Sequence, residues 1–180
     1  MNTKALSKTR AMVLAALFCA LTAIGAFIRI PMPFMDYVTL QSAFVVLAGL
    51  LLGGKLGALS MALYVALGLL GAPIFAAGGG IGYVFRPSFG YLVGFIPAAW
   101  LAGQIGCGAH GYMRLFLAAL AGLLVIYIVG ITYKYLMLVS MAETVPLSAL
   151  LISTATAQLP GDAAGCAVAA WIVPRLSKAL

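Results

Sequence analysis

The sequence predicts an all-α integral membrane protein, a bundle of six transmembrane helices with both chain termini in the cytoplasm. Hydrophobic residues make up 65% of the chain and charged residues only 7%, whereas soluble domains carry about 25% charged residues. The apolar residues form continuous runs instead of alternating with polar ones, which favours helices over a transmembrane barrel. Basic residues gather in alternate connections and set the orientation. Residues 1–180 therefore form a single transmembrane domain in the cell membrane, which we expect to be bacterial.

The first span is expected at residues 11–30, after an N-terminal segment whose lysines and arginine should stay in the cytoplasm. Four alanines in this span form two pairs spaced one helical turn apart: Ala11 with Ala15, and Ala16 with Ala20. Small residues at this spacing let two helices approach closely. Alanine is also a common filler of apolar helices, so the pattern alone leaves a docking face and ordinary packing equally open.

The connection at residues 31–38 is expected to be an outer loop, because Pro31 and Pro33 cannot continue the first helix. The second span is expected at residues 40–52. Thr39 is placed to cap that helix, and Gln41 lies in its first turn. Gln41 is either a satisfied amide at a helix start or a ligand contact, and capping preference does not separate the two.

The third span is expected at residues 56–70, after a tight turn that contains Lys55. Gly49, Gly54 and Lys55 match part of a phosphate-binding loop. Leu56 replaces the Ser or Thr that would hold magnesium, and the strand before the loop is missing. The chain is therefore not expected to bind or hydrolyse ATP.

A glycine-rich and aromatic stretch at residues 71–91 follows, and it cannot form one helix. Irregular backbone at membrane depth is tolerated only when it is buried in protein or lines a cavity. This stretch should therefore fold back into the bundle, where Phe75, Tyr83, Phe85 and Tyr91 could form flat walls. Arg86 stands among apolar neighbours and needs a partner: lipid headgroups, Asp162 or an anionic ligand group. The alternative is a lid that only plugs the bundle.

The last three spans are expected at residues 88–102, 115–138 and 160–173, with a short helix at residues 147–157 on the outer face. Tyrosines and Lys134 near the end of the fifth span match an interfacial anchor pattern. His110, in a glycine-rich turn, is expected to be solvated. With one histidine and no nucleophile beside a base, the chain is not expected to be an enzyme. Its three cysteines form no metal pattern, so no cofactor or metal is expected.

The segment from Gln158 to Asp162 carries an acid at the mouth of the last span. Leu159 should be extended because it precedes Pro160, and Pro160 suits the first position of a helix. Asp162 would then lie near the positive end of the helix dipole. Acids at membrane depth are costly and usually functional, although Asp162 could instead only cap its own helix. Its convergence with Gln41, Tyr83 and Arg86 on the outer half is typical of a small-molecule site.

Four stretches together resemble the BioY family, the biotin-binding S components of energy-coupling factor transporters. They are residues 30–41, 71–76, 87–95 and 159–162, the last reading Leu-Pro-Gly-Asp. The resemblance implies six helices, a biotin pocket near the outer face, and a partner module of one transmembrane T subunit with two ATPases. The family's small-residue motif for docking the T subunit matches either alanine pair of the first span.

The chain departs from that family pattern at Gly165, where the family usually has a lysine three residues after the aspartate. The hypothesis is that Arg86 supplies the missing cation for the biotin carboxylate, while Asp162 accepts hydrogen bonds from the ureido N–H groups. The aromatic residues would sandwich the bicycle, with Thr39 and Gln41 beside them. The alternatives are an S component for another vitamin-like ligand and a structural membrane protein without a ligand.

Overall fold

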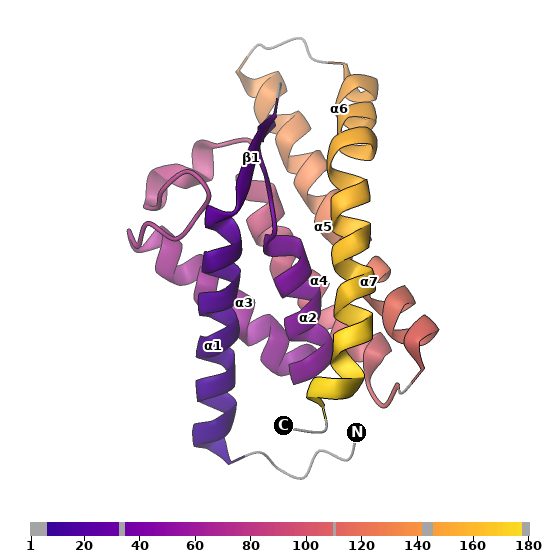
Figure 1. The fold of residues 1–180 in the computed structure, drawn as a ribbon. Helices are drawn as coiled ribbons and strands as arrows, with labels where there is room; N and C mark the ends of the chain where they lie inside the picture. The colour runs from indigo at the N-terminus through magenta and orange to yellow at the C-terminus, as the bar shows by residue number, and fades with distance from the viewer. Residues whose placement is uncertain (1–6, 33–34, 110, 142–145, 178–180) are drawn as a thin grey trace.

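The computed structural model describes residues 7–32, 35–109, 111–141 and 146–177. They form a helical bundle in which the start of the first helix and the end of the last lie at the same end (Figure 1). The helices are α1 (Lys8–Phe27), α2 (Gln41–Leu52), α3 (Gly54–Leu69), α4 (Phe89–Gly106), α5 (Tyr112–Ser140), α6 (Leu147–Ser153) and α7 (Leu159–Leu176). This confirms the predicted all-helical membrane bundle.

The apolar exterior agrees with a membrane setting. Among the described helices, α1, α4 and α5 are each long and apolar enough to cross a membrane, and α2 and α3 are shorter apolar helices. Large apolar side chains such as Met12, Leu124 and Ile128 are more than half exposed on the helix surfaces. An exposed apolar surface of this extent suits contact with lipid.

The segment expected as an outer loop between the first two spans contains a β-hairpin, so the prediction of a loop was wrong. Helix α1 ends at Phe27, and β1 (Arg29–Met32) pairs antiparallel with β2 (Met35–Thr39), with Ile30 opposite Val38. The prolines stop the helix, and the β-branched and aromatic residues around them favour extended backbone. The hairpin stands above α2 at the end of the bundle opposite the start of α1 and the end of α7 (Figure 1).

Helix α4 lies at the centre and packs closely against α2 because glycines remove side chains at their crossing. A Cβ atom on Gly49 would lie 2.3 Å from the carbonyl oxygen of Ala99, and one on Gly103 would lie 2.6 Å from the carbonyl oxygen of Gly49. Ala98, Ala99 and Ala102 are fully buried there. Small residues at such crossings let membrane helices approach closely.

The glycine-rich segment after α3 folds back over the bundle, as the sequence predicts. Phe75 is only 1% exposed, and its ring occupies the space that a side chain at Gly68 would take. The Tyr133 hydroxyl donates to the carbonyl of Val84, and the Arg29 guanidinium donates to the carbonyl of Ala76. The segment, which includes the 3₁₀ turn η1 (Ile81–Phe85), is thereby tied to α5 and to the hairpin.

The last helix does not begin at Pro160, and Leu159 is not extended, which corrects two predictions. Leu159 is helical (φ −55°, ψ −42°), and a π-helical turn, η2 (Thr154–Gln158), joins α6 to α7 without a break. The backbone N–H of Leu159 donates to the carbonyl of Thr154, five residues back. Pro160 lacks an N–H and would clash with a carbonyl in a regular helix. The wider turn lets the helix continue through it.

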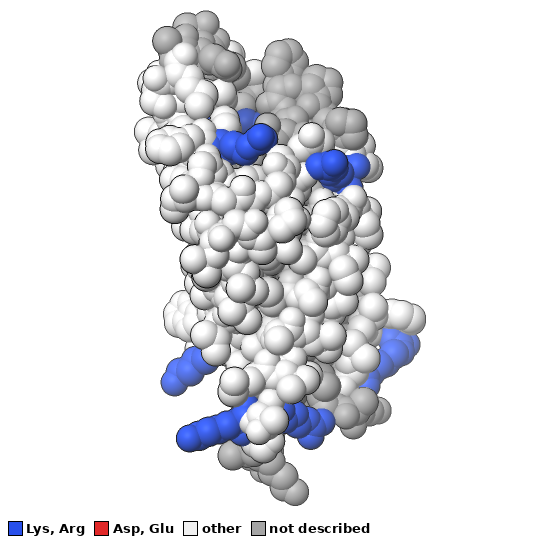
Figure 2. All heavy atoms as spheres, turned by 90° about the vertical axis from the view of Figure 1, so that its left-hand side faces the viewer, with Lys and Arg blue, Asp and Glu red and all other residues white. Residues whose placement is uncertain are grey.

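Basic side chains lie near both ends of the bundle, with a broad uncharged belt between them on the face seen in Figure 2. Near the start of α1 and the end of α7 are those of Lys8, Arg10, Lys55, Arg114 and Arg175, and at the hairpin end are those of Arg29, Arg86 and Lys134. Lys4, His110 and Lys178, which also entered the sequence analysis, lie outside the described residues.

Candidate ligand-binding site

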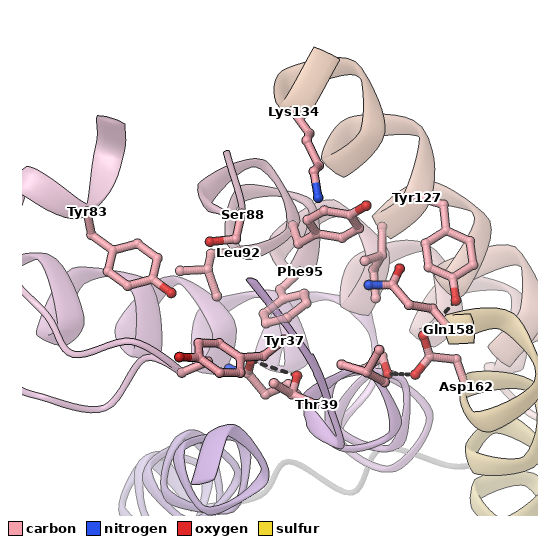
Figure 3. A pocket seen from close by; sticks show the side chains of 16 residues that line it. Tyr37, Thr39, Tyr83, Ser88, Leu92, Phe95, Tyr127, Lys134, Gln158 and Asp162 are labelled. Atoms are coloured by element: carbon pink, nitrogen blue, oxygen red, sulfur yellow. Dashed lines mark hydrogen bonds between the residues drawn. The ribbon is translucent and has the colours of Figure 1, made fainter. Parts of the chain in front are cut away.

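A cavity lies beneath the hairpin and the segment that follows α3, and it encloses about 670 Å³ of empty space, its open mouth included. Its walls come from β2, α2, α4, α5 and the continuous helix that α6, η2 and α7 form together. The segment that follows α3, called the covering segment below, completes them (Figure 3). The lining residues are Tyr37, Val38, Thr39, Gln41, Ser42, Ala76, Tyr83, Ser88, Tyr91, Leu92, Phe95, Ile126, Tyr127, Lys134, Gln158 and Asp162.

Asp162 joins three helices at one wall of the cavity. One carboxylate oxygen accepts a hydrogen bond from the Ser42 hydroxyl of α2, and the other accepts from the Tyr127 hydroxyl of α5 at 2.6 Å (Figure 3). A carboxylate offers about four lone-pair positions, so two hydroxyl donors leave acceptor capacity on the cavity side. Asp162 lies within the continuous helix of α6, η2 and α7, and hydroxyl groups of two other helices donate to its carboxylate. Its role is therefore more than that of a cap at a helix start.

Gln41 lies inside the protein with its side chain fixed at both ends. It is 3% exposed, its amide nitrogen donates to the Tyr64 hydroxyl at 2.6 Å, and its carbonyl oxygen accepts from Thr39 at 3.0 Å. Thr39 belongs to β2 and does not cap α2, whose N-cap residue is Leu40 without a side-chain hydrogen bond. The hairpin takes Thr39 away from the capping position and turns it towards the cavity, so the capping prediction was wrong.

Aromatic rings form much of the remaining wall. Tyr83 is 5% exposed and lines the cavity, as do Tyr37 and Tyr91. Phe75 is not among the lining residues. Its ring packs behind Tyr83, with 4.7 Å between the ring centroids. The buried Phe75 ring thus supports Tyr83 from behind, whereas Phe85 is 71% exposed and lies outside the lining, so its prediction as a wall residue was wrong.

Three buried polar atoms that face the cavity have no hydrogen-bond partner within the described part of the chain. They are the Ser88 hydroxyl, the Tyr91 hydroxyl and the side-chain carbonyl oxygen of Gln158. Leaving such a group unsatisfied costs about 1–3 kcal/mol. Three of them around one cavity indicate that a polar guest, water or ligand, completes their hydrogen bonds.

Lys134 is a cavity residue, and its assignment as an interfacial anchor was wrong. It is 6% exposed, and its side chain reaches from α5 into the cavity (Figure 3). Arg86, in contrast, is exposed and is not among the lining residues, and its guanidinium lies 5.5 Å from the centroid of the Tyr83 ring. This geometry does not favour Arg86 as the cation that meets a ligand inside the cavity.

The cavity therefore brings together five of the residues singled out from the sequence: Thr39, Gln41, Tyr83, Tyr91 and Asp162. Sequence reasoning missed Ser42, Tyr127, Gln158 and Lys134. A signal existed for Lys134, because an ionisable residue inside a predicted span is a functional candidate by default. Ser42 and Tyr127 carried no comparable signal, since their importance follows from the position of Asp162 between them.

The departure at Gly165 lies outside the cavity. A Cβ atom on Gly165 would lie 2.9 Å from the Cβ atom of Ala43 in α2. The glycine thus permits close packing of α7 on α2, and a lysine at this position would not fit without a shift of the two helices. The family resemblance implies a cavity-facing side chain at position 165, and this implication was wrong for the present chain. Within the described residues, no group of three or more His, Cys, Asp or Glu side chains could hold a metal.

The alanines of α1 divide into an inward and an outward set. Ala15 is 4% exposed, and its carbonyl accepts a hydrogen bond from Ser60 of α3 at 2.6 Å. Ala16 and Ala20 are exposed, and Ala11 is partly exposed. The pair Ala16 and Ala20 is therefore the one that a further helix could reach.

Comparison with known proteins agrees with this architecture. The family model described as BioY family matches residues 1–180. The chain is 46% identical over 132 residues to a probable biotin transporter BioY of Lysinibacillus sphaericus (72% of this chain, 67% of that one). It is 46% identical over 127 residues to one from Pyrococcus horikoshii (68% and 73%). A crystal structure of the S-component for biotin from an ECF-type ABC transporter aligns with a TM-score of 0.83 at 26% identity, covering 99% of this chain and 94% of that one. The chain belongs to the BioY family.

Proposed function

We propose that this BioY-family chain is the membrane-embedded subunit that binds biotin for uptake by an energy-coupling factor transporter. The observation that carries the proposal is the cavity whose lining holds the Asp162 carboxylate and three buried polar atoms that have no hydrogen-bond partner among the described residues. Relatives of the chain are named biotin transporters, and the aligned crystal structure is that of an S-component for biotin.

The chemistry of the cavity suits the ureido ring of biotin, which offers two N–H donors and one carbonyl acceptor. Asp162 has spare lone pairs for an N–H group, and the Gln158 side-chain oxygen is a free acceptor within the described residues. The hydroxyls of Ser88 and Tyr91 could donate to a carbonyl. Tyrosine rings then cover the apolar faces of the bicycle, because aromatic walls suit a flat, largely apolar body.

The orientation follows from the basic residues. Five described Lys and Arg residues lie near the start of α1 and the end of α7, against three at the hairpin end. Basic residues favour the cytoplasmic side, so both termini would be cytoplasmic and the cavity would open on the outer face. Labelling of single cysteines placed in the hairpin, in intact cells, tests this assignment.

The chain would work with partners. We propose a transmembrane T subunit with two ATPases, because nothing in the sequence supplies a complete ATP site and uptake needs energy. The exposed pair Ala16 and Ala20 on α1 gives a smooth, small-residue surface on which a helix of the T subunit could pack. The chain itself then binds and releases its ligand without catalysing a reaction.

Two measurements on the purified protein test the proposal. Mass spectrometry of small molecules that co-purify should find biotin, and radiolabelled biotin should bind at one site per chain with unlabelled biotin, but not thiamine, competing. Recovery of a different vitamin would favour an S component of another specificity. No bound molecule and no biotin binding would favour a structural membrane protein.

A further inference from the structure

Lys134 is the one basic side chain among the described residues that line the cavity, and membrane proteins rarely keep a basic group at such a place without a function. Lys134 lies in α5, a helix long and apolar enough to cross a membrane. It is 6% exposed, and its ammonium group points into the cavity (Figure 3). Basic residues within such helices are costly, face interior cavities and mark the paths of ions and substrates.

The positive and negative groups of the cavity lie on different walls. Asp162 projects from α7 with its oxygens held by Ser42 and Tyr127, whereas Lys134 enters from α5 (Figure 3). Apolar side chains, including those of Leu92 and Phe95, line the cavity as well. The complementary ligand has N–H donors at one end, an apolar middle and an anionic group at the other end.

From this arrangement we infer that Lys134 binds the carboxylate of the ligand and makes the cavity selective for the free acid. The inference rests on the proposed function, since it assigns the second end of biotin within the same cavity. Arg86, which belongs to the segment after α3, is exposed, lies over the Tyr83 ring and is not among the lining residues. Solvent and salt screen the exposed guanidinium, whereas they screen a charge inside the cavity much less.

The test compares biotin with biotinamide, its uncharged primary amide, by equilibrium binding to the purified full-length protein and its variants. Wild type should prefer biotin by about thirtyfold or more, because a buried ion pair that loses one partner weakens binding by at least that factor. Lys134→Gln should bind biotinamide within about threefold of wild type while the preference for biotin falls to about threefold or less. Lys134→Met serves as a second neutral variant if the first cannot be recovered.

Arg114→Gln is the matched control, because Arg114 is an exposed cation on the same helix at the opposite end. It should keep the wild-type preference. Equal weakening of both ligands in Lys134→Gln, or an unchanged preference, would overturn the assignment of Lys134. Loss of the preference in Arg86→Gln but not in Lys134→Gln would transfer the role to Arg86. If wild type binds neither ligand, the proposed function itself fails.

Discussion

Asp162→Asn is the substitution that examines the ligand site most directly. Asp162 accepts hydrogen bonds from Ser42 and Tyr127 on two other helices, and its remaining lone pairs face the cavity. Asparagine keeps the size and one carbonyl oxygen but removes the charge and half of the acceptor capacity. Because hydroxyls can both donate and accept, the two neighbouring side chains can re-pair with the amide, and the fold should persist.

The expected loss of affinity follows from the type of hydrogen bond removed. A hydrogen bond to a charged group contributes about 1.5–3 kcal/mol, and each 1.4 kcal/mol changes affinity about tenfold. If the carboxylate accepts one ureido N–H of biotin, Asp162→Asn should weaken biotin binding by about 10- to 100-fold. If the asparagine amide nitrogen faces the ligand, it cannot accept the ureido hydrogen bond, and the loss of biotin affinity should lie in the upper part of that range.

The measurement is a titration of ligand-free protein in detergent with radiolabelled biotin, together with its thermal unfolding. Gly161→Ala is the matched control, since a Cβ atom there meets nothing within 4 Å and alanine favours the helix. It should bind biotin as wild type does. An Asp162→Asn protein that unfolds at the wild-type temperature and binds biotin within about threefold of wild type would refute the role given to this carboxylate.

Three further predictions concern the surroundings of the cavity. Gly68→Ala should lower the free energy of unfolding by about 1–3 kcal/mol, because the new Cβ would lie 2.0 Å from the buried Phe75 ring, which supports Tyr83. Thermal unfolding measures this loss, with Gly111→Ala as the control. Arg29→Gln should speed biotin release about three- to tenfold, because it unties the hairpin from the covering segment, as stopped-flow dissociation would show. Ala16→Leu should weaken co-purification with the T subunit at unchanged biotin affinity, whereas Ala15→Leu should destabilise the chain itself, since Ala15 is buried.

The positions of several helices could be predicted from the sequence because apolar runs and breakers determine them almost locally. The predicted second span, 40–52, corresponds to α2 at Gln41–Leu52, and the predicted fifth, 115–138, lies within α5 at Tyr112–Ser140. The inward fold of the segment after α3 was also predictable, because glycine-rich apolar backbone has no other stable place at membrane depth. These conclusions needed no knowledge of which helices pack together.

Features that depend on neighbouring segments could not be predicted in this way. Pro160 usually signals a helix start, yet here the chain stays helical through it with a π turn, and the helix preceding it packs with the bundle. Likewise, neither short segment of the hairpin predicts a strand by itself. The strands form because the two segments pair with one another. Lys134 was misassigned because tyrosines flank it, and the same composition suits both a membrane interface and a tyrosine-lined cavity.

The continuous helix through Pro160 has a consequence for how ligand binding could affect the bundle. Asp162 is hydrogen-bonded to α2 and α5 while it projects from α7, so the three helices meet at one carboxylate. Gln158 lies one turn earlier on the same continuous helix, and its side-chain oxygen, which no described residue bonds, faces the same cavity. A ligand that bonds both residues would therefore act on α7 at two successive turns, directly beside the π turn. Since π turns are irregular points of a helix and frequent at functional sites, a change in ligand occupancy would be transmitted first to the junction of η2 and α7.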